Sequence, residues 1–127
     1  MFDWRTYLAL AHELAQRTDE AALRAAISRA YYAAYGVACD YVGSRRVQER
    51  NGKNQGSHQQ VWEVLRDDPV TVEQGKRSSL VKMAYELKWG REKADYRKHV
   101  AIKTADVDMA LAKASKLISM ITKLPPL

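Results

Sequence analysis

Arg91 is the residue whose type and position most strongly indicate chemistry in this 127-residue chain. It follows Leu80, Ala84 and Leu87 at helical spacing, so its guanidinium is predicted to point toward packed surface instead of free solvent. A buried guanidinium needs a partner, and Asp95 lies one helical turn later, where a carboxylate can pair with it. At the rim of a cleft, the same planar group would instead hold a phosphate through two hydrogen bonds. The sequence leaves both interpretations open.

Basic side chains and one histidine follow this arginine. His99 lies eight residues beyond Arg91, whereas His12 and His58 are far from it in the sequence. A histidine beside an arginine can transfer a proton when an RNA 2′-hydroxyl attacks its own phosphodiester, and the arginine stabilises the charge on the phosphoryl oxygens. The plainer interpretation of His99 is a surface residue in a polar turn. The basic residues near Arg91 are Lys88, Lys93, Arg97 and Lys98, offset by Glu92 and Asp95.

A second group of polar and aromatic residues precedes this region on another predicted helix. Neighbours on a helix are about 100° apart, so Tyr31 is predicted to point inward and Tyr32 elsewhere. Most of the aromatic surface of Tyr31, Tyr32 and Tyr35 is expected to be core or an interface between copies. One tyrosine hydroxyl, Ser28 or Arg29 is a candidate to line a cleft.

Apolar residues recur at helical spacing along nearly the whole chain, which predicts an all-α fold. We expect a single domain, residues 1–127, built as an antiparallel bundle of about five helices. The first helix is expected to follow Asp3 as its cap, and the second to run from Thr18 or Asp19 to about Val42 and end at Gly43. The third helix is expected to start with a capping box at Ser57 and Gln60 and to break at Asp67-Asp68-Pro69. The fourth is expected to start with a capping box at Thr71 and Gln74 and to be weakened at Trp89-Gly90, and the last to start at a Thr104 cap and stop at Pro125-Pro126. The basic polar segment from Ser44 to Gly56 is compatible with ordering on binding or with remaining solvated.

Charge and composition indicate which classes of partner the chain can bind. The chain has 21 basic and 15 acidic side chains, a net charge of +6. Such a charge draws polyanions over about a Debye length, so RNA or a nucleotide is the first partner class to test, although a small protein also keeps a charge for solubility. Cys39 is the only cysteine, which rules out a disulfide within the chain and favours a cytoplasmic setting.

Other function classes find no support in the sequence. No apolar run approaches the length of a membrane span, and Met1-Phe2-Asp3-Trp4 does not resemble a secretory leader, so we expect no membrane association. No histidine or carboxylate pair has convincing metal-ligand spacing, and the glycines are too scattered for a phosphate-binding loop. We therefore expect neither a metal nor a cofactor.

Three segments resemble the small prokaryotic HEPN-domain family. Ser28 to Tyr35 resembles the second-helix signature of that family, Arg91 to Tyr96 resembles its arginine-led segment, and Gly56-Ser57-His58 resembles the turn before its third helix. The resemblance covers about residues 20 to 120. It implies a helical bundle that forms a homodimer, with the arginine segments of two subunits facing each other across a shared cleft.

The resemblance also implies a function. Many members of this superfamily are metal-independent ribonucleases; some act as toxins in toxin–antitoxin or other defence modules, often encoded with a minimal nucleotidyltransferase. Their active motif has four to six residues between an arginine and a histidine. Arg91 matches the arginine, but the permitted histidine positions hold Tyr96, Arg97 and Lys98, and His99 follows seven intervening residues. This departure favours binding over cleavage.

Three hypotheses follow. In the favoured one, the chain is a non-catalytic HEPN-like protein that binds RNA, a nucleotide or a nucleotidyltransferase partner through a basic cleft at a dimer interface. In the second, it is a metal-independent ribonuclease in which Arg91 stabilises the phosphate and His99 transfers the proton. In the third, both motifs only form a packed dimer seam. The candidate binding or orienting residues are Arg29, Tyr32, Lys93, Asp95, Tyr96, Arg97 and Lys98.

Overall fold

The chain folds as a bundle of helices. The computed structural model describes residues 1–43, 57–67 and 77–125, which contain no strand and five helices. The helices are α1 (Arg5–Leu14), α2 (Glu20–Val42), α4 (Ser57–Asp67), α6 (Arg77–Tyr96) and α7 (Thr104–Thr122). The predicted all-α class is therefore confirmed. Among the described residues, no helix has the length and apolar character that crossing a bilayer requires.

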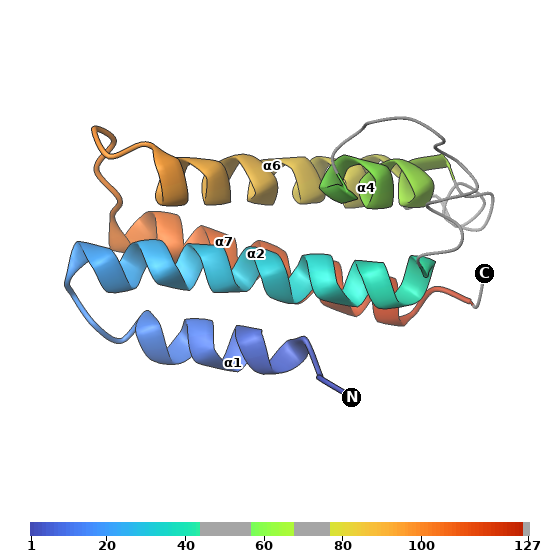
Figure 1. Ribbon diagram of the computed structural model, residues 1–127, viewed down its shortest axis with the longest axis horizontal. Helices are drawn as coiled ribbons and strands as arrows, with labels where there is room; N and C mark the ends of the chain where they lie inside the picture. The colour runs from blue at the N-terminus through green and yellow to red at the C-terminus, as the bar shows by residue number, and fades with distance from the viewer. Residues whose placement is uncertain (44–56, 68–76, 126–127) are drawn as a thin grey trace.

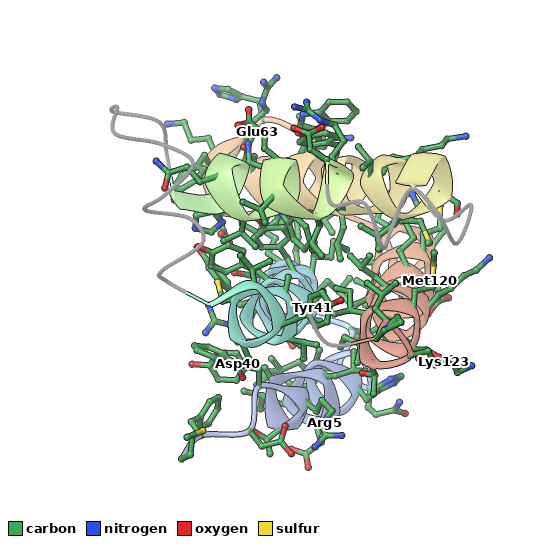
Figure 2. All side chains as sticks on the ribbon, turned by 90° about the vertical axis from the view of Figure 1, so that its right-hand side faces the viewer. Arg5, Asp40, Tyr41, Glu63, Met120 and Lys123 are labelled. Atoms are coloured by element: carbon green, nitrogen blue, oxygen red, sulfur yellow. The ribbon has the colours of Figure 1, made fainter. Side chains whose placement is uncertain are left out.

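Helix α2 is the centre of the bundle, because it contacts each of the other four helices. Figure 1 shows α1 on one side of α2, α4 and α6 on the other, and α7 alongside it. Helices α1 and α6 run opposite to α2 and α7, as an antiparallel bundle requires. In the view along the bundle, Arg5 of α1 and Glu63 of α4 lie on opposite outer sides, and side chains fill the space between the helices (Figure 2).

Several predicted helix ends are confirmed by their hydrogen bonds. The Asp19 carboxylate, at the expected cap of α2, accepts the backbone N–H of Ala22 at 3.2 Å. The Asp3 carboxylate accepts the backbone N–H of Arg5 at 3.0 Å, but Trp4 holds the cap position of α1, so the expected cap at Asp3 is wrong by one residue. Both bonds fill amide donors that a helix start leaves free. Gly43 has a φ of 76° directly after α2, the left-handed conformation that favours glycine at a helix end.

The expected cap at Thr104 is wrong by one residue. Helix α7 begins at Thr104 itself, and extended Lys103 occupies the cap position. The Asp106 carboxylate reaches back to accept the Lys103 backbone N–H at 2.9 Å. A carboxylate in the first turn also interacts favourably with the positive end of the helix dipole, which explains why the helix starts here.

At the expected weak point, Trp89-Gly90, α6 continues without a break to Tyr96. Leu87, Arg91 and Ala94, on either side of the glycine, are all buried in the bundle. Tertiary packing of this face outweighs the roughly 1 kcal/mol by which a glycine weakens a helix interior.

Two further expectations lie outside the described residues: the conformation of the segment from Ser44 to Gly56, and the capping box of Thr71 with Gln74. Helix α4 begins at Ser57, the expected start, but the Ser57 side chain is also outside the description.

Small residues let the other helices approach α2 closely. Gly36 shows this most clearly, because a Cβ added there would lie 2.1 Å from Cγ and Cδ2 of Trp4 and 2.7 Å from its Cβ. The indole of Trp4, one residue before the start of α1, thus lies directly against the α2 backbone. The other small residues on the buried side of α2 are alanines, namely Ala22, Ala26, Ala30, Ala33, Ala34 and Ala38.

Replacement of Gly36 by alanine is expected to lower the free energy of unfolding by about 1–3 kcal/mol, because the added methyl group overlaps the base of the Trp4 side chain and forces it aside. Chemical denaturation measures the change. The double variant G36A/W4A should lose less than the sum of the two single variants, because the overlapping partner is gone. Strict additivity would contradict the close contact.

Candidate functional site around Arg91

Arg91 is almost fully buried, at 7% exposure, as the helical spacing predicts. Its Nη1 atom lies 3.7 Å from Asp95 Oδ2 and 3.5 Å from Tyr96 Oη. Its Nε atom is buried without a hydrogen-bond partner among the residues that the structure describes. The predicted pairing with Asp95 is present, but both polar contacts are long for hydrogen bonds. The guanidinium is thus held in place with much of its donor capacity unused.

Aromatic rings surround the Arg91 guanidinium. Its Cζ atom lies 5.2 Å from the ring centroid of Tyr31, 5.5 Å from that of Tyr32 and 5.7 Å from that of Tyr96. These distances allow cation–π attraction, which offsets part of the cost of burying the charge. Tyr31 is buried and Tyr32 partly exposed, so the predicted difference between them is confirmed.

A chain of polar contacts positions the Asp95 carboxylate. Ser28 Oγ donates to Asp95 Oδ2 at 3.2 Å, and Arg29 Nη2 donates to Ser28 Oγ at 3.3 Å. The Arg29 guanidinium lies 4.9 Å from the Tyr7 ring and 5.2 Å from the Tyr32 ring. The two arginines therefore connect through Ser28 and Asp95, from α2 to α6.

Arg24 holds the end of α6 that carries Asp95 and Tyr96. Its Nη1 donates to the carbonyl oxygens of Ala94 at 2.9 Å and Lys93 at 3.3 Å. Its Nη2 donates to the carbonyl of Arg97 at 3.3 Å and to that of Val100. One guanidinium thus binds four carbonyls around the end of α6, of which those of Lys93 and Arg97 also accept the backbone N–H groups of Arg97 and Val100. The negative end of the helix dipole favours a cation there. The sequence analysis did not identify Arg24.

His58 lies in this site, contrary to the expectation that only His99 is near the basic cluster. Its ring stacks on Tyr35 with centroids 4.0 Å apart, and its Nδ1 atom is 2.8 Å from Tyr31 Oη. The Trp62 indole donates to the same Tyr31 oxygen at 3.1 Å. Since the indole is only a donor, the Tyr31 hydroxyl can give its own proton to His58 Nδ1, which assigns the imidazole proton to Nε2.

The electrostatics agree with a neutral imidazole. Burial lowers the pKa of His58, and the positive charges of Arg91 and Lys88 lower it further. Burial also raises the pKa of Tyr31 well above its usual value, so its hydroxyl keeps its proton. His58 lies in the first turn of α4. Its place in the segment Gly56-Ser57-His58, part of the family resemblance, was the available sequence signal for including it.

His99 and three basic candidates lie away from this centre. His99 is exposed, beyond the end of α6, and no contact joins it to Arg91 within the described residues. Arg97 and Lys98 are exposed in the same turn. Lys93 lines a separate hollow between α6 and α7. Of the candidates, the structure gathers Arg91, Arg29, Tyr32, Asp95 and Tyr96.

The arrangement suits binding of an anion. Within residues 1–43, 57–67 and 77–125, no three histidine, cysteine or carboxylate side chains are grouped as metal ligands. Instead, the site has a preplaced guanidinium with unused donors, a second arginine, exposed aromatic surface on Tyr96 and a neutral histidine nearby. Comparisons of the chain with protein-family models, with curated proteins and with solved structures found no match.

Replacement of Arg24 by alanine is expected to cost at least about 2 kcal/mol of stability, because hydrogen bonds to a charged group are worth about 1.5–3 kcal/mol each and water replaces only part of them. Hydrogen exchange should show faster opening of amides around Asp95. Arg5→Ala, which removes an exposed pair with Asp3, is the control and should change stability by less than about 1 kcal/mol. Equal effects of the two substitutions would contradict the role of Arg24.

The lowered pKa of His58 predicts a pH-dependent stability. The histidine of an unfolded chain titrates at about pH 6.5. Above that pH, His58 is neutral in both the folded and the unfolded protein, so its protonation does not reduce the free energy of unfolding. As the pH falls below it, the unfolded chain takes up a proton that the folded state resists, and the free energy of unfolding decreases until the folded pKa is passed. Denaturation curves between about pH 7.5 and 5 measure this loss.

His58→Asn isolates the contribution of the imidazole, because an amide oxygen can still accept the Tyr31 proton but does not titrate. The decrease in stability between neutral and acidic pH should be smaller in this variant than in the wild type. His99→Asn, at an exposed position, controls for the loss of one imidazole. A His58→Asn profile as steep as that of the wild type would show that another group is responsible.

Proposed function

We propose that this protein binds RNA or a nucleotide through the surface around Arg91. The observation that carries the proposal is the shortage of acceptors at the buried guanidinium. An arginine has five N–H donors, and among the described residues Arg91 has only contacts of 3.5 Å to Tyr96 and 3.7 Å to Asp95. A phosphate oxygen is the acceptor that best fits a charged planar donor of this kind.

The neighbouring side chains favour a ligand with both phosphates and bases. Guanidinium groups and aromatic rings alternate from Tyr7 through Arg29 and Tyr32 to Arg91 and Tyr96. The outermost ring, Tyr96, is 74% exposed and therefore free to stack on a base. Single-stranded nucleic acid combines phosphate charge with bases that stack on aromatic rings. The net charge of +6 would draw such a polyanion.

The family resemblance supports a wider context within this proposal. A HEPN-like binding protein would act as a homodimer in the cytoplasm, within a prokaryotic toxin–antitoxin or defence module, and pair with a nucleotidyltransferase. The Arg91 surface is formed by a single chain, so the proposed binding does not depend on a second subunit.

Labelled single-stranded RNA is expected to bind with an affinity that falls as salt rises, with a logarithmic slope of about −0.7 for each phosphate neutralised. Fluorescence anisotropy over a salt series measures it. Tyr96→Leu should weaken binding by about 1–3 kcal/mol through lost stacking, and Arg91→Lys should weaken it through the lost planar donors. Lys98→Ser should reduce the slope, whereas Lys123→Ser, which removes the same charge directly after the C-terminal end of α7, should not.

The ribonuclease hypothesis remains a second candidate because His58 and Arg91 contact the same residue, Tyr31. The same RNA mixtures, kept in EDTA and analysed on denaturing gels, separate the two functions. Intact RNA is the result expected for a binding protein. Fragments from the wild type and His99→Asn, but not from His58→Asn or Arg91→Lys, would favour cleavage by Arg91 and His58. No affinity for RNA or nucleotide at low salt would contradict both and favour the packed-seam interpretation.

A further inference from the structure

A hollow between α6 and α7 lies apart from the Arg91 site. Its volume is about 280 Å³, and its floor includes Ile27, Leu87 and Ile102. Two large apolar side chains stand at its edge, Trp89 at 59% and Met109 at 56% exposure. An exposed apolar patch with protruding side chains is typical of an interaction surface.

On this surface each of the two helices carries one acidic and one basic residue, and the order of the two charges in space is opposite on the two helices. Glu86 and Lys93 on α6 are seven residues apart, as are Asp106 and Lys113 on α7, and all four line the hollow. Residues seven apart share a helix face. The helices run antiparallel, which brings Glu86 within 3.7 Å of Lys113. The hollow is therefore neutral overall in a protein of charge +6, which makes it a poor surface for a polyanion.

Gly90 lies between Glu86 and Lys93 on α6 and also lines the hollow. A Cβ added at Gly90 would meet no atom within 4 Å, so the fold does not require a glycine there. Glycine weakens a helix interior compared with alanine. Its remaining physical advantage is that it permits close approach of another backbone from outside.

We propose that this face binds a second copy of the chain. A two-fold axis in the plane of the interface, crossing α6 between Trp89 and Gly90, would pack the two α6 helices antiparallel. Glu86 of each copy would then face Lys93 of the other. The same axis crosses α7 between Met109 and Ala110, because Glu86 neighbours Lys113 across the hollow, and it would set Asp106 against Lys113.

A single axis thus satisfies both helices, which is the self-complementarity that a two-fold contact requires. Trp89 of one copy would occupy the open space over Gly90 of the other. A partner of different sequence would have no need of a charge pattern that reverses about one point. The proposal is independent of RNA binding, because it uses a different face of α6.

Analytical ultracentrifugation over a concentration series tests the proposal. The wild type should be a dimer. Glu86→Lys and Lys93→Glu should each raise the dimer dissociation constant by about tenfold or more, because like charges then face each other. Mixing the two variants should restore a dimer, since every pair between them is attractive again. Glu13→Lys, on exposed α1 surface, should dimerise like the wild type.

Each contrary result overturns the proposal. A wild type that stays monomeric at all concentrations would exclude the interface. A dimer that survives both single substitutions would place the contact on another face. Two monomeric variants that remain monomeric when mixed would show that the charges do not pair in this way, and circular dichroism would confirm that both variants are folded.

Discussion

The rest of the site depends on the hydrogen bonds of one side chain, the guanidinium of Arg24. It joins the beginning of α2 to the end of α6 through hydrogen bonds to carbonyls of the last helical turn and of the following turn. Figure 1 shows these two segments at the same end of the bundle. The guanidinium is rigid and planar, so it can donate to several carbonyls at once in only one arrangement. These hydrogen bonds therefore set the register of α6 against α2. That register decides which α2 side chains Asp95 and Tyr96 meet.

The register explains why Arg91 has no close ion pair. Asp95 is bound by Ser28, and the same carboxylate oxygen stays 3.7 Å from Arg91. A closer ion pair would satisfy the buried charge, but the bond to Ser28 holds the carboxylate back. The faces of three tyrosines compensate without using the N–H donors. The result is a buried charge that the fold tolerates, although its Nε atom has no hydrogen-bond partner among the described residues.

Sequence reasoning succeeded for side-chain directions within one helix, missed two helix caps by one residue and failed for contacts that join two helices. The inward direction of Arg91, its pairing with Asp95 and the difference between Tyr31 and Tyr32 follow from the fixed angle between helical residues. The contact of His58 with Tyr31 spans 27 residues, and those of Arg24 span about 70. In the sequence, Arg24 resembles an ordinary partner of Glu20, and that pair does form at 3.0 Å. Distance along the chain was a poor guide to distance in space, which is why His99 was preferred over His58.

Helix α6 separates two kinds of surface. Trp89 and Arg91 are two residues apart and therefore about 200° apart around the helix, so the exposed indole and the buried guanidinium face different sides. The hollow beside Trp89 has balanced charges, and the surroundings of Arg91 are positive. A copy bound at the hollow would leave both Arg91 surfaces open, one on each subunit. Such a dimer would differ from the shared cleft that the family resemblance implies, because the Arg91 surfaces of its two subunits would not face each other.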